Sequence, residues 1–209
     1  MDLLSGQYLP GIIHYYQGTQ EGGFAAGAVL PEAEPEREFT MSCTNAADFD
    51  GDGDLDLLIG DVKGEVFVNR NTGSRAEFKF GAREPVLAGG KALKVCQKSD
   101  PLPVDWDGDG RLDLLVGDEA GDLTFFRGRG DGAFDAGVSL WTGLSHAKPT
   151  FAEINKSLGE KRLVPGYRLR LATGDWNADG RLDLLVGNCE ETDSGTPTGF
   201  VRVFLRQKD

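Results

Sequence analysis

Short runs of apolar residues, each bounded by glycine, aspartate or asparagine, recur along the whole chain. They are rich in aliphatic, β-branched and aromatic side chains, which is typical of β-strands. No segment keeps a 3.6-residue period for three turns, and the best helical candidate, residues 151–158, is short. The pattern therefore predicts an all-β protein. Its clearest strand runs are LDLLIG at 55–60, EVFVN at 65–69, LTFFR at 123–127 and VRVFL at 201–205.

One segment of fourteen residues occurs three times in the chain. The copies are DFDGDGDLDLLIGD at 48–61, DWDGDGRLDLLVGD at 105–118 and DWNADGRLDLLVGN at 175–188. Each is followed by a short turn and a second apolar run, which begins at Gly64, Gly121 and Gly199. Beyond a further glycine-rich turn, Phe78 and Phe134 stand at matching places. Such internal repetition predicts one supersecondary unit used several times.

An incomplete fourth copy stands at the N-terminus. Residues 2–6 match residues 56–60, and residues 11–16 match the run that begins at Gly64. Phe24 then corresponds to Phe78. The upstream half of the aspartate loop is missing from this copy, so we expect the chain to be a piece of a longer repeat protein.

Each unit is predicted to be a four-stranded antiparallel meander of about 50 residues. One strand precedes the aspartate loop, and three follow it. The sheets then contain three, four, four and three strands in chain order. Because one such sheet cannot bury both faces alone, we predict a β-propeller built of four-stranded antiparallel blades, as a fragment of a larger ring. The whole chain, 1–209, forms this single partial domain, with repeats at about 1–38, 39–92, 93–145 and 167–209 and an insertion at 146–166.

The aspartate loops, D-x-[DN]-x-D-G-x-x-D, suit a hard cation. Calcium takes roughly six to eight oxygen ligands and tolerates irregular geometry. Side chains at positions 1, 3, 5 and 9 and the backbone carbonyl at position 7 would converge on one ion, while glycine at position 6 permits a sharp bend. We therefore predict about three Ca²⁺ sites. Their ligands are Asp48, Asp50, Asp52, Asp54 and Asp56; Asp105, Asp107, Asp109, Arg111 and Asp113; and Asp175, Asn177, Asp179, Arg181 and Asp183.

Two other interpretations of these loops are weaker. An EF-hand needs glutamate at position 12 and a helix after it, but Ile59, Val116 and Val186 stand there inside strand runs. Aspartate and glycine also form ordinary turns, yet turns do not need several carboxylates that repel one another. Because Asn177 replaces an aspartate, the third site should be the weakest. The calcium ions would be structural.

Charge and motifs exclude several classes of function. The net charge is −12, which disfavours a nucleic-acid or anionic-membrane surface. No apolar run approaches the length of a membrane-spanning helix, and no signal peptide is visible in MDLLSGQYLPG. With two histidines and no GxSxG, HExxH or P-loop pattern, the chain is predicted not to be an enzyme.

The loop pattern followed by L-L-[VI]-G resembles the FG-GAP repeats, also called VCBS-type repeats. The resemblance covers nearly the whole chain and implies a β-propeller, as in integrin α-chains, with calcium in the loop between strands 1 and 2. The family's ligands fall on the loop residues given above. Departures are the missing first loop, Ala178 in place of glycine, and a phenylalanine-glycine dipeptide only at 80–81. The resemblance also implies a secreted or cell-envelope protein, whose signal peptide would lie upstream.

The predicted function is therefore a non-catalytic calcium-binding module that serves as a scaffold or as an adhesion or ligand-binding domain. Insertions at 143–166 and 189–198 fall on the face opposite the calcium loops, where a carbohydrate or protein ligand could bind. The alternatives are part of a polysaccharide lyase or hydrolase, or an adhesin that uses the RGD tripeptide at 129–131. Trp106 and Trp176 match Phe49 at loop position 2, and we expect both to pack between sheets.

Overall fold

The regular structure of the described part of the chain consists of β-strands. The computed structural model describes residues 2–6, 12–30, 43–74, 77–141, 167–191 and 197–207, and this part of the chain contains strands and no helix. Accordingly, none of its elements is a helix long and apolar enough to cross a membrane. The helical candidate at 151–158 lies outside the described residues. The expectation of an all-β fold is confirmed.

Four antiparallel sheets follow one another along the chain. The first has the order β1 (Leu3–Gly6), β2 (Ile13–Tyr16), β3 (Ala28–Val29), and the second the order β4 (Cys43–Ala47), β5 (Asp56–Gly60), β6 (Val66–Asn71), β7 (Phe80–Pro85). The third has the order β10 (Asp100–Val104), β11 (Asp113–Gly117), β12 (Leu123–Phe126), β14 (Val138–Trp141), and the fourth the order β15 (Tyr167–Gly174), β16 (Asp183–Glu191), β17 (Pro197–Phe204). Their strand numbers are the three, four, four and three that the repeats predict.

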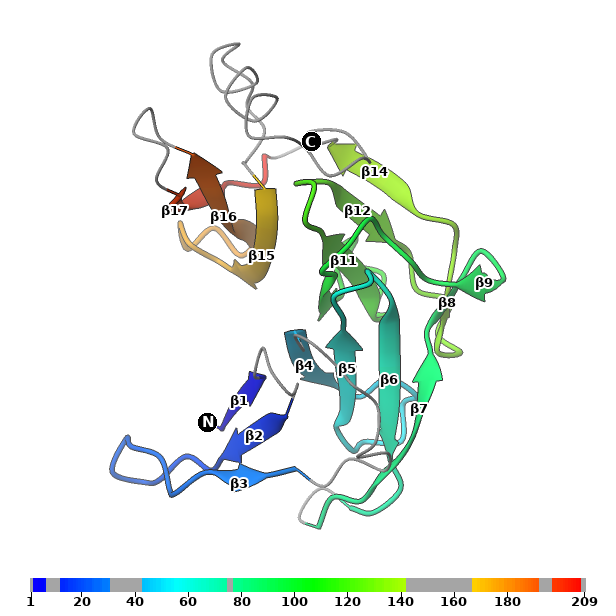
Figure 1. The fold of residues 1–209 in the computed structure, drawn as a ribbon, viewed down its shortest axis with the longest axis vertical. Helices are drawn as coiled ribbons and strands as arrows, with labels where there is room; N and C mark the ends of the chain where they lie inside the picture. The colour runs from blue at the N-terminus through cyan, green and yellow to red at the C-terminus, as the bar shows by residue number, and fades with distance from the viewer. Residues whose placement is uncertain are drawn as a thin grey trace.

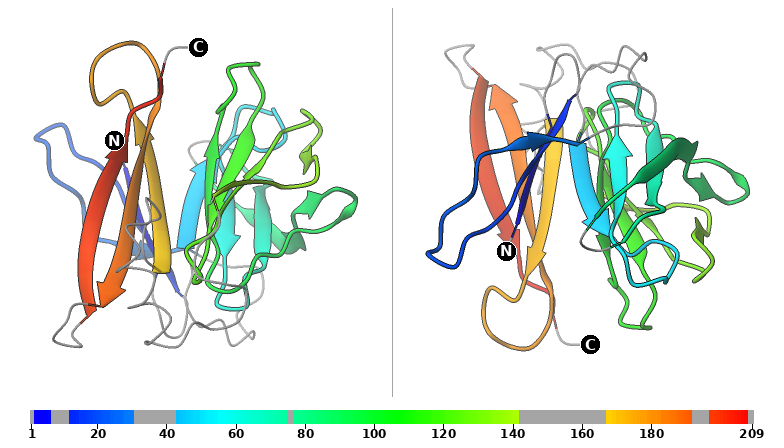
Figure 2. Two further views of the ribbon diagram at one scale, coloured as in Figure 1. Left: turned by 90° about the horizontal axis from the view of Figure 1, so that it is seen from above. Right: turned by 90° about the horizontal axis from the view of Figure 1, so that it is seen from below.

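The four sheets lie along an arc, with the first and the fourth at its two ends (Figure 1). Strand order in each sheet runs from the middle of the arc outward, and β1, β4, β10 and β15 contact one another in succession at the inner side. The long strands β15–β17 run through the thickness of the molecule (Figure 2). Because the strands alternate in direction, all aspartate loops lie at one end of the sheets.

The apolar core is divided into layers between neighbouring sheets. Leu57 and Ile59 of β5 face the first sheet, whereas Leu58, between them, packs with residues of the third. The next layer, between the third and fourth sheets, contains Leu115 and Leu184. This alternation follows from the two-residue period of a strand, which sends successive side chains to opposite faces. A continuous run such as LDLLIG is therefore what a sheet buried on both faces requires.

The glycine that ends each LLIG or LLVG run permits close approach of the next sheet. A Cβ on Gly60 would lie 2.2 Å from the carbonyl oxygen of Ser99, and one on Gly117 would lie 2.7 Å from the Cβ of Leu169. Both neighbours belong to the following repeat. The next inner strand can therefore pack directly on the backbone only because these positions carry no side chain.

A small fifth sheet is absent from the sequence prediction. It joins β8 (Leu87–Ala88) and β9 (Lys91–Ala92) to β13 (Ala133–Phe134), and β13 pairs with β8 in parallel. The Gly89 N–H also donates to the carbonyl oxygen of Phe134 at 3.0 Å. These two-residue strands have no apolar periodicity, so only the packing of the second and third sheets creates their pairing.

The sequence alignment of the phenylalanines is wrong by two residues. Phe134 pairs with Gly128 and Phe24 with Gly18, whereas the residue in the equivalent pair with Asn71 is Phe80, not Phe78. The turn before Phe80 is longer than its counterparts, so counting from the preceding strand misplaces the match. Phe80 is buried in the layer between the first and second sheets.

The buried Asp100 of β10 leads to a pH-dependent prediction. Its Oδ2 accepts the Leu171 N–H at 2.7 Å, and burial raises its pKa, an effect that nearby Arg170 opposes. A raised native pKa means that stability is present at low pH and is lost as pH rises through that pKa. Asn at position 100 keeps the acceptor and cannot ionise. We expect Asp100→Asn to be more stable than the native protein at pH 7, with the difference shrinking toward pH 4, in urea unfolding. Equal stability at both pH values would contradict this expectation.

Candidate metal centre

The first aspartate of each loop closes the loop by accepting backbone hydrogen bonds. Asp105 Oδ1 accepts the Gly108 N–H at 2.9 Å, and its Oδ2 accepts the Gly110 N–H at 3.0 Å. Asp48 accepts the N–H groups of Gly51 and Gly53 in the same way, at 2.8 and 3.0 Å. In the third loop, Asp175 accepts the N–H groups of Asp179 and Gly180, both at 2.9 Å. The three loops therefore share one backbone path.

This path brings the carboxylates at positions 1, 3 and 5 together. Each residue offers an oxygen, and the three oxygens lie within 4.8 Å of one another in the first and second loops. Calcium binds oxygens at about 2.3–2.6 Å, so oxygens on opposite sides of one ion lie about 5 Å apart. The donor set thus fits a calcium ion in size and chemistry. The gathered residues are Asp48, Asp50 and Asp52 in the first loop and Asp105, Asp107 and Asp109 in the second.

The third loop offers the same arrangement with one amide in place of a carboxylate. Asn177 Oδ1 accepts the Asp179 N–H at 3.1 Å, as Asp107 Oδ1 accepts the Asp109 N–H at 3.2 Å. Asn177 also donates its side-chain N–H to Asp179 Oδ2 at 2.9 Å. An amide oxygen can bind calcium, but it brings no charge.

Two residues in each loop adopt left-handed backbone angles. The predicted bend at position 6 is confirmed, with φ of 94° at Gly53, 83° at Gly110 and 83° at Gly180. Position 4 bends in the same way, which the sequence analysis did not anticipate. Glycine occupies it in the first two loops, but the third carries Ala178 at φ 57°. A residue with a Cβ is strained there by about 1 kcal/mol.

Ala178→Gly is accordingly expected to raise the stability of the protein by about 0.5–1 kcal/mol, because it removes that strain. The matched reverse change in the second loop, Gly108→Ala, should lower it by a similar amount. Urea unfolding of both variants measures the difference. Two changes of the same sign would contradict the expectation.

The aspartates at position 9 are buried and held by backbone groups. Asp113 is 0% exposed; its Oδ2 accepts the Trp106 N–H at 2.9 Å, and its Oδ1 accepts the Gly128 N–H at 2.7 Å. Asp56 bonds to Phe49 and Asn71 in the same way, and Asp183 to Trp176 and Arg206; these two are also almost fully buried. Each carboxylate thus ties the start of its loop to the end of the third strand. Its direct contact with calcium stays a prediction.

The pKa values of two of these carboxyl groups move in opposite directions. Burial raises the pKa of Asp56, although hydrogen bonds from Asn71 and Phe49 oppose the shift. The Arg206 N–H hydrogen bond lowers the pKa of Asp183. Burial therefore dominates at Asp56, whereas backbone hydrogen bonding dominates at Asp183.

The truncated N-terminal copy preserves one part of this arrangement. Asp2 Oδ1 accepts the Gly18 N–H at 2.8 Å, which is the contact that Asp113 makes with Gly128. Asp2 therefore takes the place of the position 9 aspartates in the first sheet. The structural equivalence supports the alignment of residues 2–6 with residues 56–60.

Arginines neutralise the loops unequally. Arg70 bonds to Asp50 Oδ2 at 2.9 Å in the first loop. In the second loop, Arg127 contacts Asp107 and Arg111 contacts Asp109. The hydrogen bond to Asp107 raises the pKa of Arg127. The second loop thus carries two opposing cations close to its carboxylates.

Position 7 contributes charge as well as a carbonyl group. Arg111 and Arg181 turn their side chains back to the position 5 carboxylates, Asp109 and Asp179. Asp54 stands at this position in the first loop. Calcium binding by the three backbone carbonyls at position 7 stays a prediction.

Sequence reasoning gave no role to the aspartates that end the repeated segment. Asp118 Oδ1 accepts the N–H groups of Ala120 and Asp122, and its backbone carbonyl accepts the Leu169 N–H of the next sheet at 3.0 Å. Asp61 forms the same turn and accepts the Ser99 N–H at 3.1 Å. Their recurrence at the same place in the first two of the three complete copies was the available signal. They join neighbouring sheets through these hydrogen bonds.

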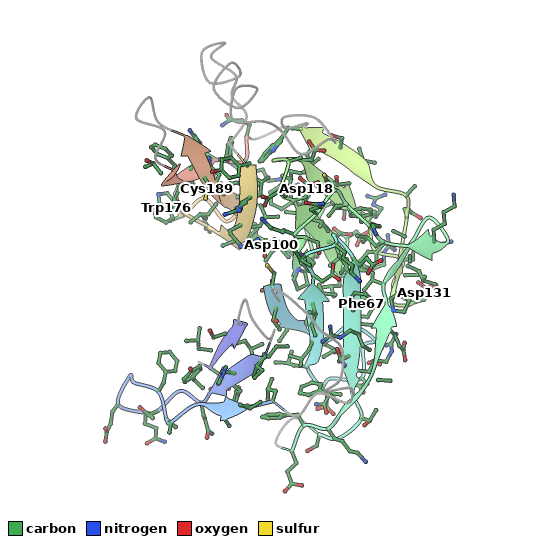
Figure 3. All side chains as sticks on the ribbon, in the orientation of Figure 1. Phe67, Asp100, Asp118, Asp131, Trp176 and Cys189 are labelled. Carbon is green, nitrogen blue, oxygen red and sulfur yellow. The ribbon has the colours of Figure 1, made fainter. Side chains whose placement is uncertain are left out.

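The other candidate features have mixed outcomes. The tripeptide at 129–131 is exposed, and Asp131 lies at the outer edge of the arc (Figure 3). Residues 143–166 lie outside the described residues. The predicted turn at 189–198 is partly strand, because Cys189 pairs with Gly199 and the β16–β17 hairpin continues beyond them.

The tryptophans at loop position 2 differ from each other. Trp106 packs in the layer between the third and fourth sheets, and the Arg206 guanidinium lies 5.1 Å from its ring centre. The prediction is wrong for Trp176, which is 65% exposed on the far side of the fourth sheet from the third (Figure 3). It faces the side on which no further sheet is described.

A cavity of about 660 Å³ lies between the first and second sheets. Its walls combine the aromatic rings of Tyr15 and Phe78 with the polar side chains of Asp2 and Asn45. Leu55 of the first aspartate loop also lines it, so the cavity reaches the loop end of the sheets. The predicted ligand face is the opposite one.

Comparison with known proteins gives one family match. The model of the FG-GAP-like repeat matches residues 105–186, which include the second and third aspartate loops. No curated protein matches the sequence. A solved structure of an Agrocybe aegerita lectin, described as recognising non-reducing terminal N-acetylglucosamine, is similar with a TM-score of 0.45 and 17% identity. The similarity covers 97% of this chain and 52% of the lectin chain, and it is too weak to assign a fold or a ligand.

Proposed function

Since this chain is an FG-GAP-type repeat protein, we propose that it is a non-catalytic calcium-binding module, with one structural Ca²⁺ in each of its three complete aspartate loops. The observation that carries the proposal is the convergence of three carboxylate oxygens within 4.8 Å in the first and second loops. The third loop closes through the corresponding backbone hydrogen bonds to Asp175. Gathered carboxylates repel one another by about 1 kcal/mol or more per pair at a protein surface, and a divalent cation removes that cost.

Calcium fits these loops better than magnesium. Magnesium demands near-ideal octahedral geometry and keeps several waters, whereas calcium accepts a crowded and irregular oxygen shell. Each loop would supply such a shell from one short segment. The ions would stabilise the loops, because the same segment joins the inner strand of each sheet to its neighbour.

The architecture we propose for the module is part of a β-propeller. The inside-to-outside strand order of each sheet, the arc in Figure 1 and the core layers between sheets support this assignment. Like many calcium-dependent modules, it would act outside the cell or in the cell envelope, where calcium is millimolar.

Calcium titration calorimetry tests the proposal. We expect about three sites in the native protein and one fewer in each of Asp48→Asn, Asp105→Asn and Asp175→Asn. Asn177→Asp should tighten the third site, because it adds one ligand charge. Asp135→Asn, which changes an exposed acid outside the loops, is the matched control. An unchanged number of sites in all three loop variants would refute the assignment.

The cavity between the first and second sheets favours ligand binding as a further role of the module. Aromatic rings beside a few polar groups are typical of small-molecule sites, and its volume lies in their usual range. We propose a carbohydrate as the first ligand class to examine. Tyr15→Ala should abolish binding of any glycan found on an array, whereas Tyr16→Ala should not.

A further inference from the structure

One face of each internal sheet packs on the preceding sheet in the chain, and the other face packs on the following sheet. Leu114 of the third sheet and Phe134 of the adjoining β13 pack on the second sheet, whereas Leu115 and Leu123 of the third sheet pack on the fourth. We call these the predecessor face and the successor face. The repeated register allows the same positions to be compared in every sheet.

The successor face of the fourth sheet is apolar and exposed. Val201 pairs with Gly187, as Leu123 pairs with Gly117 in the third sheet. Leu123 is 0% exposed, but Val201 is 72% exposed. Trp176 is 65% exposed, whereas its counterpart Phe49 is 6% exposed.

Gly187 gives independent evidence that this face is built for a neighbour. Its counterparts Gly60 and Gly117 lack a side chain because the next sheet lies against them. A Cβ on Gly187 would meet only Arg170 of its own sheet, at 3.5 Å. The close-approach glycine is therefore retained on a face that no described sheet covers.

The predecessor face of the first sheet also exposes apolar residues whose counterparts in the other sheets are buried. Leu3 occupies the position of Leu57, Leu114 and Leu184, which are at most 4% exposed, yet Leu3 is 46% exposed. Phe24 occupies the position of Phe134 and is 53% exposed, against 2% for Phe134.

The two end faces carry the two halves of one internal contact. Phe49 of the first aspartate loop and Phe134 of β13 pack together, with ring centres 5.7 Å apart. Trp176 stands at the position of Phe49, and Phe24 stands at that of Phe134. Trp176 of one copy could therefore pack on Phe24 of another copy, as Phe49 packs on Phe134 within one chain.

We propose that two copies of this chain associate head to tail, with the successor face of the fourth sheet of one copy packed on the predecessor face of the first sheet of the other. The interface continues the one already present between consecutive sheets. A heterologous contact of this kind closes into a ring when the rotation permits. Two copies would supply eight sheets, four of them four-stranded and four of them three-stranded, within the roughly 4–8 blades of known propellers. The inference goes beyond the proposed calcium binding.

Sedimentation equilibrium with calcium present tests the association. We expect the mass of two copies for the native chain. The double variant Trp176→Asp/Val201→Asp should weaken association by about 100-fold, because it places charge at the centre of the interface. Val138→Asp, at an exposed apolar position on β14 outside both end faces, should leave the mass unchanged. Circular dichroism spectra establish that each variant is folded.

Mixing experiments identify the geometry. Leu3→Asp/Phe24→Asp should also be monomeric alone, but a mixture with the Trp176→Asp/Val201→Asp variant should form one-to-one pairs, because one intact interface remains. A native chain that stays monomeric would overturn the proposal and would indicate that these faces are covered by other repeats of a longer polypeptide. Pairs that persist in both double variants would also overturn it. The calcium titration is independent of either result.

Discussion

Replacing Asp113 by alanine is expected to lower the free energy of unfolding by about 3 kcal/mol or more, even with EDTA present. The Asp113 carboxylate is 0% exposed and accepts N–H groups of Trp106, Asp107 and Gly128 at 2.9, 3.3 and 2.7 Å. Alanine leaves these donors without their acceptor, and each such buried group costs about 1–3 kcal/mol. Urea unfolding in EDTA measures the loss.

Asp105→Ala is the matched control within the same loop. The Asp105 carboxylate also accepts backbone N–H groups, but the loop around it is exposed, so water can replace it. In EDTA we expect a loss of about 1 kcal/mol or less. In calcium both variants should lose further stability, since both remove a predicted ligand. Similar losses for the two variants in EDTA would show that the position 9 carboxylate has no special structural role.

Calcium is expected to raise the melting temperature by about 8–16 °C relative to EDTA. If free calcium is about tenfold above the dissociation constant, each site adds about 1.4 kcal/mol, and three sites add about 4 kcal/mol. For a chain of this size, each kcal/mol shifts the melting temperature by about 2–4 °C. Differential scanning calorimetry in millimolar calcium, and again in excess EDTA, measures the shift.

Two controls define the origin of this shift. Magnesium at the same concentration should give a much smaller rise, because the loops do not favour its octahedral geometry. The variant Asp48→Asn/Asp105→Asn/Asp175→Asn should melt at nearly the same temperature in calcium and in EDTA. An undiminished rise in that variant would place the calcium elsewhere, and the absence of any rise in the native protein would contradict structural calcium sites.

Much of the fold could be predicted because its information is local. The spacing of Asp48, Asp50 and Asp52 places their side chains on one side of a tight loop, and the structure gathers them. The runs after the loops have strand composition, so the strand numbers of the four sheets follow from the repeats. Phe80 escaped the alignment because a turn of different length precedes it, and only the strand pairing shows which phenylalanine takes the equivalent place.

The sequence by itself determined the all-β class, the repeat register and the carboxylates that converge in the loops, since each follows from short local patterns that recur along the chain. The tertiary structure alone decided which residues are covered by a neighbouring sheet. Trp106 and Trp176 stand in loops that differ at only two of nine positions, but only Trp106 has a following sheet to pack against among the described residues. It also decided that Asp113 accepts the Gly128 N–H, because that donor reaches the loop only after the chain has crossed the sheet and returned.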